Sequence, residues 1–89
     1  MQIKPARDTQ DAIATIERIA KDASLKEARL VLFPEAYVGG YPRGASFGTV
    51  VGNRSDEGRE AFRKYWENAI DVPGTYCEQI ANIAQRYAI

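Results

Sequence analysis

A run of four apolar residues, Leu30–Phe33, constrains the fold of this chain more than any other stretch. It follows a charged segment and has the length and composition of a short buried strand. Pro34 ends the run, because proline has no N–H to donate to a sheet and keeps the preceding residue extended. Glu35 then falls at the carboxyl end of the predicted strand, where α/β sheets gather their ligands and catalytic groups.

Glu35 is therefore the first candidate for a catalytic residue. A long loop, residues 36–54, follows it and contains five of the seven glycines. Loops of this length without secondary structure are usually functional or disordered, and large aromatic residues argue against disorder. Those aromatic residues are Tyr37, Tyr41 and Phe47. An acid enclosed by such a loop is a good proton acceptor. The alternative is an ordinary surface acid or a helix cap.

Other polar residues have simpler interpretations. Tyr41 and Arg43 are candidates for the lining of a substrate pocket, and loop packing with a surface charge is the alternative for this pair. Cys77 lies inside a predicted helix and is typical of a small apolar side chain, not of a nucleophile. Lys64 lies on a charged helix face, where solvation explains it.

Three helices are predicted around the strand. The first covers residues 9–24, where isoleucines and alanines recur every three or four positions and form one apolar stripe. The second covers residues 56–70. The third follows Thr75, which forms a capping-box pattern with Glu78, and its apolar stripe extends to Tyr87.

Composition excludes several classes of protein. The chain of 89 residues has 12 basic and 12 acidic residues, so no basic patch indicates nucleic acid. No apolar run approaches the roughly 18 residues that indicate a membrane span. A single cysteine cannot form an internal disulfide, which favours a reducing compartment such as the cytoplasm. Without histidine, the chain has no His-based triad and no His-ligated zinc site.

The residues around Glu35 have a recognisable arrangement. Phe33-Pro34-Glu35 precedes Gly40-Tyr41-Pro42, and the pattern extends along nearly the whole chain through Arg43-Gly44, Phe47-Gly48, Gly58-Arg59 and Ala69–Gly74. This arrangement closely resembles the segment around the catalytic glutamate of the nitrilases, a branch of the carbon–nitrogen hydrolase superfamily. One departure is Glu27, which stands where the family usually has glycine.

The resemblance implies an α/β fold, a partial nitrilase-like α-β-β-α sandwich to which this chain contributes one strand and three helices. Residues 1–89 are then expected to be the N-terminal part of a single nitrilase domain, incomplete at both ends. Residues 1–7 lack the strand pattern expected there, and Ala88–Ile89 resemble the start of a further strand. The resemblance also implies a homo-oligomer.

The implied activity is hydrolysis of a nitrile to a carboxylic acid and ammonia, within nitrogen compound metabolism. In nitrilases a cysteine thiolate attacks the nitrile carbon, a glutamate moves protons and a lysine stabilises charge on the reacting nitrogen. Glu35 matches the glutamate. The lysine and the cysteine are expected beyond residue 89, so the isolated chain is expected to be inactive. The implied partner is a small nitrile, with no cofactor, metal, nucleic acid or membrane.

Two other functions fit the sequence. An amidase-type hydrolase of the same superfamily would share the glutamate, lysine and cysteine, although Gly39–Gly44 favour the nitrilase branch. A catalytically inactive truncated module that binds full-length subunits would explain the missing lysine and cysteine.

Overall fold

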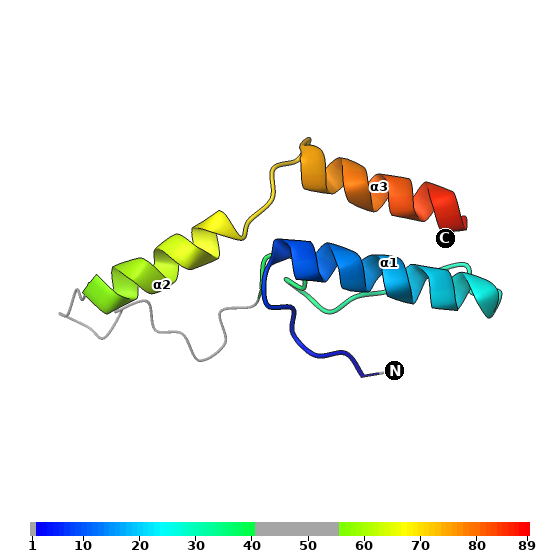
Figure 1. Ribbon diagram of the computed structural model, residues 1–89, viewed down its shortest axis with the longest axis horizontal. Coiled ribbons are helices and arrows are strands. Elements are labelled where there is room, and N and C mark those ends of the chain that lie inside the picture. Colours follow the sequence, from blue (N-terminus) through cyan, green and yellow to red (C-terminus); the bar gives the residue numbers. More distant parts are fainter. Residues whose placement is uncertain (1, 41–55) are drawn as a thin grey trace.

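The computed structural model describes residues 2–40 and 56–89. These residues form three helices, α1 (Thr9–Leu25), α2 (Asp56–Glu67) and α3 (Thr75–Tyr87). Helices α1 and α3 lie side by side, whereas α2 extends away from both of them (Figure 1). The shape is elongated, with principal extents of 52, 27 and 16 Å.

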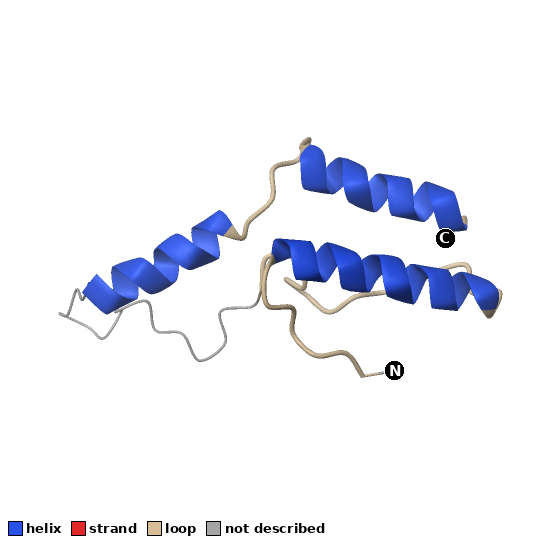
Figure 2. Ribbon diagram, viewed as in Figure 1, coloured by secondary structure: helices blue, strands red, loops and turns tan. Residues whose placement is uncertain are grey.

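The expected one-strand α/β fold is wrong for this structure. All regular elements within the described residues are helices, and no strand forms among them (Figure 2). The predicted strand, Leu30–Phe33, is loop, because no described residue pairs with its backbone N–H and C=O groups. A strand is defined by such pairing, which four apolar residues cannot supply for themselves. The described fold is therefore helical.

Helix α1 confirms the first predicted helix. The Asp8 carboxylate caps it by accepting a hydrogen bond of 2.8 Å from the Asp11 N–H. One face of α1 is buried, and it consists of Thr9, Ala12, Ile13, Ile16, Ile19 and Ala20. The helix ends in a turn at Lys26 and Glu27, and Glu27 has a φ of 61°. This left-handed backbone suits glycine, the residue that the resemblance led us to expect at this position.

Helix α3 begins at Thr75, the residue predicted as its cap, and so starts one residue earlier than the sequence indicated. Gly74 occupies the N-cap position, and the Thr75–Glu78 capping box does not form. A Cβ atom at residue 74 would lie only 2.8 Å from the carbonyl oxygen of Asp71, so the close turn before α3 requires glycine. At the other end, Ala88 adopts a left-handed conformation and closes the helix, so Ala88–Ile89 do not begin a strand.

The core lies between α1, α3 and the segment that follows α1. Its buried residues are Ala12, Ile13, Ile16, Ala20, Tyr37 and Ile83, with Phe33 and Val38 packed against them. Polar contacts join the middle of α1 to the end of α3: Glu17 of α1 accepts hydrogen bonds from the Arg86 guanidinium at 2.5 Å and from the Tyr87 hydroxyl at 3.2 Å. This packing fixes the segment that carries Glu35.

Helix α2 is attached to the other helices through its C-terminal end. The hydroxyl of Thr9, a buried residue at the start of α1, donates a hydrogen bond of 2.6 Å to the carbonyl oxygen of Asn68. On the surface of α2, Arg63 forms ion pairs with Glu60 and Glu67. The helix ends at Glu67, three residues before the end predicted from the sequence.

Candidate active site

Glu35 begins a turn that directly follows the extended segment. The turn covers residues 35–39, and the Tyr37 N–H closes it by donating a hydrogen bond of 3.2 Å to the carbonyl oxygen of Pro34. Ala36 has a φ of 57°, a conformation that is uncommon for a residue other than glycine. The turn therefore places two neighbouring side chains differently: Glu35 is exposed, and Tyr37 is buried.

Glu35 lines a cavity of about 140 Å³ between the turn and the N-terminal segment. The other lining residues are Ile3, Pro5, Ala6, Pro34, Ala36, Tyr37 and Gly40. A water molecule has about 30 Å³ of liquid volume, so the cavity has room for a small functional group. The walls are mainly apolar, and Glu35 contributes the one carboxylate among the described residues that line the cavity. The enclosure expected around Glu35 is not provided by the described residues, which leave its side chain exposed.

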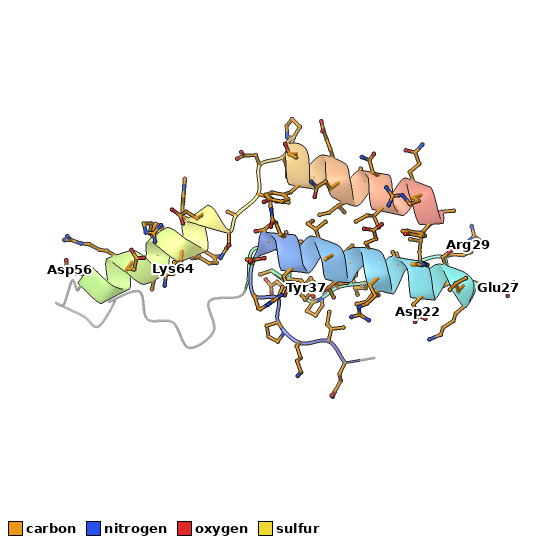
Figure 3. The ribbon with its side chains drawn as sticks, in the orientation of Figure 1. Asp22, Glu27, Arg29, Tyr37, Asp56 and Lys64 are labelled. Carbon is orange, nitrogen blue, oxygen red and sulfur yellow. The ribbon has the colours of Figure 1, made fainter. Side chains whose placement is uncertain are left out.

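Tyr37 is the buried member of this turn. Its side chain is 9% exposed, and its ring stacks on Phe33 with a centroid distance of 5.4 Å. The hydroxyl is buried, and within the described structure it has no hydrogen-bond partner. Figure 3 shows Tyr37 against the N-terminal half of α1. Sequence reasoning did not select Tyr37 as a site residue, although its position two residues after Glu35 was a usable signal.

The other residues considered from the sequence do not meet at this cavity. Tyr41 and Arg43 lie outside the described residues, so their predicted place in a substrate pocket stays a prediction. Cys77 is half-buried in α3, and Lys64 is exposed on α2, far from Tyr37 in Figure 3. Neither side chain lines the cavity beside Glu35. Both positions agree with the structural interpretation that the sequence favoured.

Two further features of the described residues bear on function. No group of three His, Cys, Asp or Glu side chains is placed there to hold a metal ion. None of the helices α1, α2 and α3 is long and apolar enough to cross a membrane.

Comparison with known proteins decides the family. The family model described as carbon–nitrogen hydrolase matches residues 1–89, the whole chain. The chain belongs to the carbon–nitrogen hydrolase family. No solved structure matches the chain.

Within this carbon–nitrogen hydrolase family, the chain is similar to nitrilases. It is 57% identical over 75 residues to a nitrilase of Bradyrhizobium diazoefficiens. The aligned residues are 84% of this chain and 22% of that protein. It is 46% identical over 82 residues to a bifunctional nitrilase/nitrile hydratase of Nicotiana tabacum. The aligned residues are 92% of this chain and 24% of that protein. Nitrilase 3 of Arabidopsis thaliana is 48% identical over 77 residues, which are 86% of this chain and 22% of that protein. The chain thus spans about a quarter of the length of these relatives.

Proposed function

We propose that this chain contributes the proton-accepting carboxylate, Glu35, to a nitrilase that converts a nitrile and water to a carboxylic acid and ammonia. The observation that carries the proposal is the position of Glu35, at the start of a fixed turn and on the wall of a small, mainly apolar cavity. Similarity to nitrilases over most of the chain supports the substrate class.

The proposed reaction divides the work between three groups. The Glu35 carboxylate accepts the proton of a cysteine thiol, and the resulting thiolate attacks the nitrile carbon to form a covalent thioimidate. A lysine stabilises the charge that develops on the nitrogen. Glu35 then moves the protons of two water molecules in turn. The first adds to the thioimidate, and ammonia leaves to give a thioester; the second hydrolyses the thioester, which releases the carboxylic acid and the free cysteine. Neither Cys77 nor Lys64 lines the cavity, so on this proposal the cysteine and the lysine come from outside the described site.

A chimera tests this proposal. The aligned 75 residues of this chain replace the matching residues of the Bradyrhizobium nitrilase. The rate of ammonia release from a nitrile is then measured. We expect Glu35→Gln to lower the rate by roughly a hundredfold or more, because a positioned general base contributes on that scale. Glu27→Gln is the matched control, since Glu27 is also an exposed glutamate in a turn. A folded chimera in which Glu35→Gln keeps its activity would contradict the proposal.

The reaction products separate the proposed nitrilase from related enzymes. An amidase-type hydrolase would convert the matching amide faster than the nitrile. A nitrile hydratase activity, which the name of the Nicotiana relative includes, would release the amide in place of the acid. Acid and ammonia in equal amounts support the nitrilase.

We further propose that residues 1–89 are part of a single hydrolase domain, and that the working protein is a cytoplasmic homo-oligomer in nitrogen compound metabolism.

A second candidate function follows from the positions of Cys77 and Lys64, neither of which reaches the cavity of Glu35. On this alternative the 89-residue chain is an inactive module that binds longer nitrilase subunits. Recovery of such a subunit with the tagged chain would support it.

A further inference from the structure

Thr9 links the start of α1 to the end of α2. Its side chain is 4% exposed, and its hydroxyl donates a hydrogen bond of 2.6 Å to the carbonyl oxygen of Asn68. Asn68 directly follows α2, so its carbonyl is one of those that the helix itself leaves unpaired. Figure 1 shows the C-terminal end of α2 beside the start of α1. The Thr9 hydroxyl therefore holds a residue that lies 59 positions away along the chain.

The turn that begins at Glu35 ends beside the same residue. A Cβ atom on Gly39, the last residue of the turn, would lie 3.7 Å from the Asn68 carbonyl oxygen and 3.9 Å from the Cα atom of Ala69. These are ordinary van der Waals distances, so a side chain as small as a methyl group would already touch this backbone. The carbonyl group that Thr9 holds is therefore the support for the end of the turn.

Two contacts hold this turn at different points. Tyr37, in the middle of the turn, is buried in the core that α1 and α3 form. Gly39, at its end, lies against Asn68. Glu35 is at the beginning of the turn, and its side chain is exposed. Because this side chain is not itself packed in the core, the backbone contacts of the turn decide where the carboxylate lies.

We propose that Thr9 is a positioning residue for the Glu35 carboxylate. By holding Asn68 in place, the Thr9 hydroxyl fixes the end of the turn and, with it, the position of Glu35. This inference rests on the proposed function, in which Glu35 accepts the proton of a cysteine thiol. A general base must lie about 2.6–3.2 Å from the atom that gives up the proton, and a displacement of about 1 Å costs up to a hundredfold in rate. Thr9 does not line the cavity beside Glu35, so it acts through the turn.

The test uses a chimera of the Nicotiana tabacum enzyme. The aligned 82 residues, 92% of this chain, replace the matching residues of that enzyme, and they include Thr9, Glu35 and Asn68 wherever the alignment begins. The kcat and KM for consumption of a nitrile are measured. Thr9→Val keeps the shape of the side chain without the hydroxyl, and should lower kcat by roughly tenfold while KM changes less than about twofold. Thr9→Ser keeps the hydroxyl and should retain the kcat of the parent. Thr15→Val is the matched control, because it makes the same change at a half-buried threonine elsewhere on α1.

A double-mutant cycle shows whether Thr9 acts through Glu35. In a chimera that already carries Glu35→Gln, Thr9→Val should have no further effect on kcat, because the base that it would misplace is gone. A general loss of folded enzyme would instead lower kcat by the same factor in both backgrounds. If Glu35→Gln leaves kcat unchanged, the proposed function and the positioning role both fail. If Glu35→Gln lowers kcat but Thr9→Val has no effect, or an equal effect in both backgrounds, the positioning role alone fails.

Gly39 gives a second way to disturb the same contact. Gly39→Ala adds a methyl group that the distances accommodate, whereas the larger side chain of Gly39→Val pushes against Asn68. We expect Gly39→Val to lower kcat as Thr9→Val does, and Gly39→Ala to retain it. Circular dichroism and gel filtration check that each variant folds and assembles like the parent. The proposal is overturned if Thr9→Ser or Thr15→Val is as slow as Thr9→Val. It is also overturned if neither Thr9→Val nor Gly39→Val folds, because Thr9 would then serve stability alone.

Discussion

Replacing Tyr37 by phenylalanine tests how the turn after Glu35 is held. The Tyr37 hydroxyl is buried without a partner in the described structure, and a buried unsatisfied polar group costs about 1–3 kcal/mol. Tyr37→Phe removes that hydroxyl and keeps the ring, whose stacking on Phe33 contributes to the core. We therefore expect the free energy of unfolding to rise by about 1 kcal/mol. In a domain of this size such a gain raises the melting temperature by about 4–8 °C.

Urea unfolding followed by circular dichroism measures this difference, with equal m-values as the check that both proteins unfold alike. Tyr87→Phe is a matched control with the opposite expected sign. The Tyr87 hydroxyl donates a hydrogen bond of 3.2 Å to Glu17, and its loss should destabilise the chain by about 0.5–1.5 kcal/mol. If Tyr37→Phe destabilises the chain as much as Tyr87→Phe does, the Tyr37 hydroxyl has a partner in the folded protein, and the reasoning is refuted.

Two further predictions concern α1. Glu27→Gly should raise the free energy of unfolding by about 0.5–1 kcal/mol, because Glu27 has a left-handed φ of 61° that glycine adopts without strain. Lys26→Gly is the control and should lower the free energy of unfolding, because Lys26 has an ordinary φ of −93°. Chemical denaturation measures both changes. The Arg7 backbone N–H, at 2.9 Å, and the Arg7 guanidinium donate to the Asp11 carboxylate and hold its pKa below the usual value. This contribution to stability is complete above the unfolded pKa, about 4, and is lost as the pH falls through the lower folded pKa. Thermal melts should therefore depend less on pH in the acid range for Asp11→Asn than for the wild type, and identical profiles would contradict this.

The helices could be predicted from the sequence because their signals are local. The stripe of residues 9–24 became the buried face of α1, and Asp8 supplied the cap. The strand could not be decided in the same way. The apolar run Leu30–Phe33 favours an extended segment, but strand formation depends on a neighbour at a distance in the sequence. The structure describes no such neighbour, so the predicted sheet is absent from the described residues.

The candidate site was predictable only in part. Pro34 was predicted to end a strand; the strand does not form, but a turn does begin directly after Pro34, at Glu35. The left-handed conformation of Ala36 carries no local signal, because it depends on packing of the turn against α1. The enclosure of Glu35 was inferred from the composition of residues 36–54, most of which lie outside the described ranges.

The most direct test of the central claim is the rate of ammonia release by the chimeric nitrilase with three substitutions compared side by side. If Glu35 is the proton acceptor, Glu35→Gln is roughly a hundredfold or more slower than the parent, since the amide cannot take up the proton. Glu35→Asp, which keeps a carboxylate, retains part of the rate, and Glu27→Gln retains all of it. Equal rates for Glu35→Gln and Glu27→Gln in folded proteins would contradict the account, because the reaction would then not need the carboxylate of Glu35.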